Sequence, residues 1–365
     1  MENINNLSNS NNSQEVENNN NINNVENIDN NNAIVEVANG EGAEVSEPEE
    51  EVAEAEEEEV FENPFEDYPP ETEVLELLHS RLTNMNLLNL QRFKNLQLLT
   101  LRQNLITYIE SLSENLELEE LDLYDNRIES IQNLNQLTNL TSLDLSFNKI
   151  RKIENIEKLT QLTDLYLISN KINKIQNLET FVNLTNLELG ANRIRRIEGL
   201  DELVNLEKLW FGKNKIEKLE NLSSLKKLKI LSIQSNRIKK IEGLDGLEKL
   251  EEFYISHNAI EKIEGLENNL NLRTLDVGNN QISVLENISH LTQLEEFWAN
   301  NNKFTKFEEI FEQFKTLTNI DTVYFEHNPL QKEQPAQYRN KIQLNLPSSL
   351  QQIDANLIKK NSPFH

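Results

Sequence analysis

Leucine, isoleucine and asparagine recur along the chain with a period of 22 residues. One unit places Leu118, Leu121 and Leu123 before Asn126 and Ile128, and the same order returns 22 residues later. The repeated asparagines are Asn104, Asn126, Asn148, Asn170, Asn192, Asn214, Asn236, Asn258, Asn280 and Asn302. A run of unrelated amphipathic helices would have to reproduce this spacing by chance. The pattern therefore favours stacked repeats.

The order LxxLxLxxNxI within each unit predicts a short strand followed by a turn. Side chains alternate along a strand, so the two leucines of LxL point into the core and the residue between them points out. The asparagine amide can satisfy backbone groups in a turn buried between neighbouring coils. This order is the signature of leucine-rich repeats. We predict an α/β solenoid of about twelve 22-residue repeats, with a concave parallel sheet and short helical or 3-10 segments on the convex side.

Both ends of the array are irregular, as capping repeats should be. A partial unit with Leu75, Leu77 and Leu82 precedes the array and has Ser80 in place of the asparagine. The last unit reaches Asn328 four residues late, after an insertion near residues 304–316. The solenoid should therefore span residues 71–330.

The segments outside the repeats have their own patterns. Residues 331–365 should form a C-terminal cap and tail, with a helix over Gln337–Leu346. Residues 1–70 hold 20 acidic residues and no Lys or Arg, so they account for most of the net charge of −27. Their Asn-rich and Glu-rich composition predicts a disordered arm. The arm either engages a basic partner or is a solvated low-complexity tail.

Little in the sequence points to chemistry. The absence of cysteine excludes thiol catalysis, thiolate metal sites and disulfides. The five histidines form no metal-binding motif, and the nine glycines form no phosphate-binding loop. We expect no catalytic residue, metal or cofactor. A hydrolase using concave carboxylates such as Glu188 and Asp276 remains the enzyme alternative.

The ends and apolar stretches of the chain bear on its location. The N-terminus lacks a basic patch followed by an apolar stretch, and no segment approaches 18 uninterrupted apolar residues. We therefore expect a soluble intracellular protein without a signal peptide or a membrane span.

The residues between the paired strand leucines, four before each asparagine, are free for function, and we call them the concave column. They are Thr100, Asp122, Asp144, Tyr166, Glu188, Trp210, Ser232, Tyr254, Asp276, Trp298 and Tyr324. None is basic, and both tryptophans of the protein are among them. Two residues earlier lie Glu120, Asp164, Glu252 and Glu296, with Lys208 as the basic exception. The aromatics either anchor a partly basic protein partner or cover the leucine core from outside.

A basic row follows the asparagines. It consists of Arg127, Lys149, Lys171, Arg193, Lys215 and Arg237, with further Lys and Arg shortly after. Nucleic-acid binding is one interpretation. The alternative is a solvated charge ladder, because Glu154, Glu198 and Glu220 recur a few residues later in the repeats. The aromatics stand in another column, which is unfavourable for stacking bases beside phosphates, so we do not expect nucleic acid as a partner.

Several tracts are more specific than single repeats. They are Leu121-Asp-Leu-Tyr-Asp-Asn126, Ile263-Glu-Gly-Leu-Glu-Asn268, Asn287-Ile-Ser-His-Leu-Thr292, Glu296-Phe-Trp298 and the ending from Thr322 to Lys332. Over about residues 71–358, the chain resembles the leucine-rich-repeat regulatory subunits of protein phosphatase 1, the regulatory subunit 7 family. The arm lies outside this resemblance.

The resemblance implies a non-catalytic partner of the protein phosphatase 1 catalytic subunit. It implies a mainly nuclear protein, with the cytoplasm as a second compartment, and a role in mitotic chromosome segregation. It places the partner-binding positions at Asp144, Tyr166, Glu188, Trp210, Asp276, Glu296, Trp298 and Tyr324. Relatives commonly carry Phe where Tyr166 and Trp210 stand. The rivals are a splicing-particle leucine-rich-repeat protein with a protein or RNA partner, and a cytoskeletal or dynein-associated repeat protein.

Overall fold

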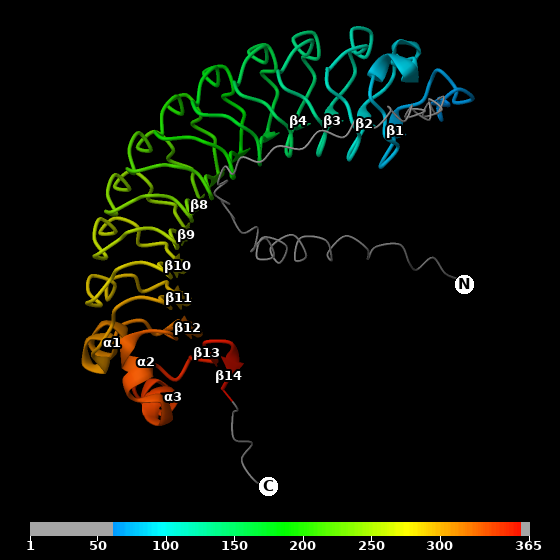
Figure 1. Ribbon diagram of the computed structural model, residues 1–365. Helices are drawn as coiled ribbons and strands as arrows, with labels where there is room; N and C mark the ends of the chain where they lie inside the picture. The colour runs from blue at the N-terminus through cyan, green and yellow to red at the C-terminus, as the bar shows by residue number, and fades with distance from the viewer. Residues whose placement is uncertain (1–60, 359–365) are drawn as a thin grey trace, which may run out of the picture. The chain divides into compact units, whose positions relative to one another are not determined.

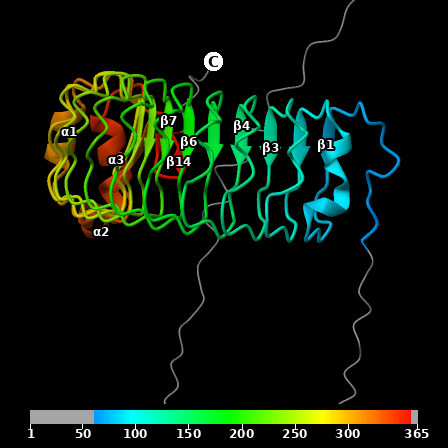
Figure 2. The same cartoon turned by 90° about the horizontal axis from the view of Figure 1, so that it is seen from above.

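The computed structural model describes residues 61–358, which form a curved solenoid with its strands along the inner edge (Figure 1). Twelve three-residue strands pair in parallel in chain order, and Figure 2 shows those from β1 to β7 side by side. They are β1 (Val74–Glu76), β2 (Leu98–Thr100), β3 (Glu120–Asp122), β4 (Ser142–Asp144), β5 (Asp164–Tyr166), β6 (Asn186–Glu188), β7 (Lys208–Trp210), β8 (Ile230–Ser232), β9 (Glu252–Tyr254), β10 (Thr274–Asp276), β11 (Glu296–Trp298) and β12 (Thr322–Tyr324). The predicted parallel concave sheet is confirmed.

The strands pair in register, so equivalent residues of successive coils lie next to one another. Asp144 of β4 pairs with Asp122 on one side and Tyr166 on the other. The middle residue of the strand, such as Leu143, is fully buried. A slip by one residue would turn these leucines to solvent, which is why the hydrophobic pattern fixes the register.

Each repeat asparagine joins its coil to the preceding one. Asn148 donates from Nδ2 to the carbonyl oxygens of Leu123 at 3.0 Å and Leu145 at 3.1 Å. Its Oδ1 accepts from the backbone N–H of Ile128 at 2.9 Å. The side chain is 8% exposed, so these backbone groups have little access to water. The hydrogen-bonding role predicted for the asparagines is confirmed.

In the part of the chain that the structure describes, helix on the convex side is confined to the first coil and the insertion. The 3-10 helices η2 (Met85–Leu88) and η3 (Leu90–Arg92) belong to the first coil, and α1 (Phe307–Phe314) to the insertion. The coil between β3 and β4 instead closes with separate turns, in which Leu137 N–H donates to the Leu134 carbonyl at 2.9 Å. An α-helix advances only about 1.5 Å per residue, so an extended connection spans the coil with fewer residues.

Packing at the N-terminal end begins before residue 71. The Phe65 side chain is 2% exposed and belongs to the hydrophobic core. Its carbonyl accepts hydrogen bonds from the Arg92 guanidinium and, at 3.0 Å, from the Tyr68 N–H. The sequence boundary at 70 lies later than this packing because a single buried phenylalanine leaves no periodic signal. Residues 1–60 of the predicted disordered arm lie outside the described residues.

The C-terminal end is closed by α2 (Pro329–Glu333), α3 (Pro335–Asn345), β13 (Gln352–Ile353) and β14 (Asn356–Leu357). Helix α3 matches the helix predicted over Gln337–Leu346. Strand β13 extends the sheet in parallel beside β12, and β14 pairs antiparallel with β13. Asp354 Oδ1 accepts from the N–H of Phe325 at 2.9 Å and from the Tyr338 hydroxyl at 3.0 Å. Asp354 thus serves the last coil as the asparagines serve the others.

Candidate partner-binding surface

The concave column lies in one row across the sheet. The eight predicted binding residues fall on β4 to β7 and β10 to β12, and all of them except Glu296 belong to this column: Asp144, Tyr166, Glu188, Trp210, Asp276, Glu296, Trp298 and Tyr324. Seven of them are partly exposed, whereas Asp276 is only 5% exposed. Parallel strands are about 4.8 Å apart, so large neighbours in this row shield one another.

Three aromatic rings cluster at the C-terminal end of the column. The ring centroids of Trp298 lie 6.1 Å from Tyr254 and 5.8 Å from Tyr324. The indole N–H donates to Glu296 Oε2 at 3.1 Å, and the Tyr254 hydroxyl donates to Glu252 Oε2 at 2.7 Å. These hydrogen bonds hold the rings in place by their polar atoms and leave apolar ring surface for a partner. Tyr254, which the resemblance does not include, belongs to this cluster.

A second aromatic group is joined through a buried amide. Asn186 Oδ1 accepts from the Trp210 indole at 3.1 Å, and its Nδ2 donates to the Tyr166 hydroxyl oxygen at 3.3 Å. Tyr166 in turn donates to Asp164 Oδ1 at 3.3 Å. Burial, and next the charge of Asp164, raises the pKa of Tyr166 to about 12. The phenol is therefore a neutral anchor at ordinary pH.

The aspartates of the column have a structural role that the sequence analysis did not assign. Asp144 Oδ1 accepts the backbone N–H of Ser146 at 2.8 Å, and Asp276 Oδ1 accepts that of Gly278 at 2.9 Å. Such Asx hydrogen bonds shape the exit from the strand. Asp276 also accepts from Gln234 Nε2 at 3.2 Å. With 5% of its surface exposed, Asp276 offers a partner less than the sequence analysis expected, and its predicted role in binding stays a prediction.

Glu188 is the carboxylate of the column best placed for a partner. No hydrogen bond to its side chain is found within residues 61–358. Burial, and next the nearby charge of Asp144, raises the pKa of Glu188 to about 7, although Lys208 acts in the opposite direction. A cationic side chain from a partner would relieve this unfavourable environment.

Arg102 neutralises the N-terminal part of the column. Its guanidinium lies 2.9 Å from Asp122 Oδ2 and 3.6 Å from Asp144 Oδ2. Burial outweighs this attraction and raises the pKa of Asp122 to about 6. Arg102, two residues before Asn104, was not among the predicted site residues. It lies two residues beyond the end of β2, and its charge at that position is the signal that could have identified it.

Ion pairs link successive coils beside the basic row. Arg196 contacts Glu220 at 3.0 Å, and Lys218 contacts Glu242 at 3.6 Å. These pairs support the solvated charge ladder as the interpretation of the flanking Lys and Arg. Exposed pairs of this kind contribute at most about 1 kcal/mol each.

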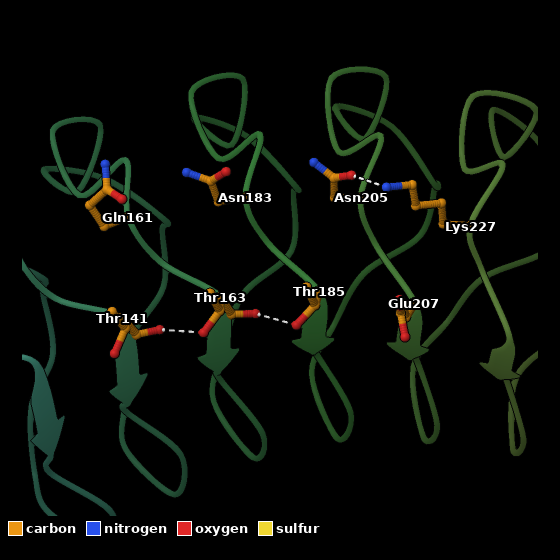
Figure 3. A pocket seen from close by; sticks show the side chains of 8 residues that line it. All are labelled: Thr141, Gln161, Thr163, Asn183, Thr185, Asn205, Glu207 and Lys227. Carbon is orange, nitrogen blue, oxygen red and sulfur yellow. Dashed lines mark hydrogen bonds between the residues drawn. The ribbon is translucent and has the colours of Figure 1, made fainter.

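A trough along one edge of the sheet holds ladders of polar side chains (Figure 3). Thr163 Oγ1 donates to the Thr141 carbonyl and Thr185 Oγ1 to the Thr163 carbonyl, both at 3.1 Å. Farther along, Lys227 Nζ donates to Asn205 Oδ1 at 2.6 Å. These hydroxyls are thus occupied with joining coils.

Residues 61–358 contain no group of three or more His, Asp or Glu side chains placed to hold a metal ion. In that range no helix combines the length and apolar character needed to cross a bilayer.

Two curated proteins match the chain over short stretches. The protein phosphatase 1 regulatory subunit SDS22 of Schizosaccharomyces pombe is 55% identical over 56 residues, which are 15% of this chain and 17% of that protein. The subunit of the same name from Saccharomyces cerevisiae is 49% identical over 53 residues, 14% of this chain and 16% of that protein. The chain thus matches about one sixth of the length of these relatives, and the resemblance seen in the sequence is confirmed over these stretches.

Solved structures and a family model agree on the architecture. An internalin (InlF) of Listeria monocytogenes matches with a TM-score of 0.64 and 24% identity, over 79% of this chain and 88% of that one. A leucine-rich-repeat protein of Leptospira interrogans gives 0.59 and 26%, over 73% and 74%. The family model "Leucine Rich repeats (2 copies)" matches residues 116–158, 138–181, 182–224, 226–268 and 270–312. These matches cover more than half of the chain, which therefore belongs to the leucine-rich-repeat family.

Proposed function

We propose that this chain is a non-catalytic regulatory subunit of protein phosphatase 1. It binds the phosphatase catalytic subunit through the concave column and modulates its activity or targeting. We place this role in chromosome segregation and in the nucleus, with the cytoplasm as a second compartment. The proposal is supported by the stretches shared with two subunits of that name. The observation that carries the choice of surface is the partly exposed cluster of Tyr254, Trp298 and Tyr324.

The mechanism divides the column into anchors and orienting charges. The rings of Trp298, Tyr324, Trp210 and Tyr166 remove apolar surface from water when a partner covers them. Glu188 pairs with a basic side chain of the partner. Because its pKa is about 7, that pairing favours the ionised form and releases a proton when binding occurs below this pH.

Direct binding to the purified phosphatase 1 catalytic subunit tests the proposal. Trp298→Ala should weaken the affinity of the full chain about 30-fold or more, as expected for a hot-spot aromatic. Val182→Ala is the matched control, because Val182 is 43% exposed and lies in the connection between β5 and β6. Its affinity should equal that of wild type. Equal affinities for wild type and Trp298→Ala would contradict the assignment of the surface.

A particle containing RNA is the second candidate partner. Arg127, Lys149, Arg151 and Lys152 line one hollow together with Tyr108, which brings an aromatic ring beside the basic row. If the chain binds RNA in a salt-dependent manner and does not bind the phosphatase catalytic subunit, this alternative replaces the proposed function.

A further inference from the structure

Phe147 and Tyr124 form an aromatic patch beside the N-terminal part of the concave column. Their ring centroids are 4.9 Å apart, and the Arg102 guanidinium lies 4.5 Å from the centre of the Tyr124 ring. Arg102 is the residue that also pairs with Asp122 and Asp144. Phe147 is 43% exposed. The patch is therefore continuous with the column through a shared cation.

The backbone gives no reason for a phenylalanine at position 147. The residue before each repeat asparagine has a positive φ, which is 54° at Phe147. Asn and Asp tolerate this left-handed region better than bulky residues do. The equivalent positions are Gln103, Asp125, Ser169, Ala191, Lys213, Ser235, His257, Asn279, Asn301 and His327. Phe147 is the one large apolar side chain in this set, and its exposure means that core packing does not favour it either.

We propose that Phe147 and Tyr124 form a second anchor for the partner that binds the concave column. This inference rests on the proposed function and deepens it. Asp144 ends β4, and Phe147 follows in the turn of the same coil. A folded partner lying on Asp144 therefore reaches Phe147 as well, and we infer that it presents an apolar side chain to the two rings. Aromatic residues beside an ion pair that a partner shields from water are typical of binding hot spots.

An alternative role for Phe147 is to cover the Tyr124 ring and so stabilise the free protein. The two roles differ in their effect on stability. If Phe147 covers the Tyr124 ring, removing its side chain lowers the stability of the folded protein. If Phe147 serves binding, removing it leaves that stability unchanged. Asn at position 147 suits the second case, since Asn279 and Asn301 occupy the same turn position with φ of 52°.

The substitution Phe147→Asn separates these roles. We expect its Tm to equal or exceed that of wild type, and its affinity for the phosphatase 1 catalytic subunit to fall about tenfold or more. Val204→Asn is the matched control, because Val204 is 46% exposed and lies in the connection between β6 and β7. The control should bind like wild type.

Each other outcome overturns the second anchor. If the affinity of Phe147→Asn lies within about twofold of wild type, Phe147 is not an anchor, because the loss of a hot-spot residue weakens binding by more than that. A lowered Tm in Phe147→Asn assigns the ring to folding. If wild type binds and Phe147→Asn binds equally, the proposed function stands without the anchor. If wild type does not bind the phosphatase, both fail together.

Discussion

Glu188 lies half-buried in a row where Asp144 is a nearby like charge, and its pKa of about 7 follows mainly from that burial. Burial likewise raises the pKa of Asp122 to about 6. A carboxyl whose pKa is raised on folding stabilises the native state while protonated. That stabilisation is complete below the unfolded pKa and is lost as the pH rises through 6 for Asp122 and 7 for Glu188.

Glu188→Gln should therefore make the protein more stable at pH 8 while having little effect at pH 5. The expected gain in the free energy of unfolding at pH 8 is on the order of 1–3 kcal/mol, because glutamine has no charge to bury. Urea denaturation at the two pH values measures it. The exposed Glu202→Gln serves as the control, with no pH-dependent gain. A gain of equal size at pH 5 and pH 8 would show that ionisation is not the cause.

At the scale of the coil, one asparagine side chain satisfies backbone N–H and carbonyl groups that would otherwise have no partner in a buried turn. The amide of Asn148 contacts backbone groups of two coils at once, so its loss leaves several carbonyls and one N–H without partners. Asn183 offers a contrast, because it is exposed and makes one bond, to the Thr160 carbonyl at 3.0 Å.

Asn148→Ala should lower the free energy of unfolding by about 2–4 kcal/mol, whereas Asn183→Ala should lower it by less than about 1 kcal/mol. Chemical denaturation of both variants measures the difference. Similar losses would mean that the amide is not what joins the coils.

In the C-terminal cap, Asp354 takes the hydrogen-bonding role of the repeat asparagines, and substitutions at this residue test that role. Asp354→Asn keeps an oxygen for the N–H groups of Phe325 and Glu326, whereas Asp354→Ala leaves both donors without this acceptor. We expect the alanine variant to lose about 2–4 kcal/mol of stability and the asparagine variant clearly less. The Tm of both variants checks this. If asparagine were as damaging as alanine, the negative charge and not the oxygen would be the important feature.

Elements that depend on the period could be predicted from the sequence, and contacts that depend on side-chain direction could not. The strands, the concave row and the helix near Tyr338 all follow from apolar spacing. The bond from Asp276 to the Gly278 N–H depends on the backbone path after the strand. The ion pair between Arg102 and Asp144 joins residues two coils apart, and no local sequence pattern predicts it. The period therefore predicts where the concave row lies, whereas the exposure of its carboxylates depends on contacts that the period does not encode.

For the molecule as a whole, the proposed aromatic anchors form separate groups along the sheet. Trp210 on β7 and Trp298 on β11 are four strands apart, or roughly 19 Å at ordinary strand spacing. Trp298 and Tyr324 are in contact, with ring centroids 5.8 Å apart. A partner that covers both groups gains from them independently, whereas rings in contact act as one unit.

Double substitutions should show this separation in partner binding. The losses of binding free energy for Trp210→Ala and Trp298→Ala should add within about 0.5 kcal/mol. Those for Trp298→Ala and Tyr324→Ala should deviate from additivity by about 0.5–3 kcal/mol. Affinities of the single and double variants for the phosphatase catalytic subunit give both cycles. Strong coupling between Trp210 and Trp298 would indicate that the partner reshapes the sheet.

The strict 22-residue register has a consequence for the history of the gene. Because Asn170 and Asn192 bond in the same way to the coils before them, excising 22 residues between equivalent points leaves every junction able to re-form. Unequal recombination can thus lengthen or shorten the coding sequence by whole units without destroying the fold. Under the proposed function, the concave row does not tolerate the loss of a unit between β6 and β11, since that loss shifts Trp298 relative to Glu188 by one strand. Natural selection on binding, and not on folding, would then hold the number of units constant.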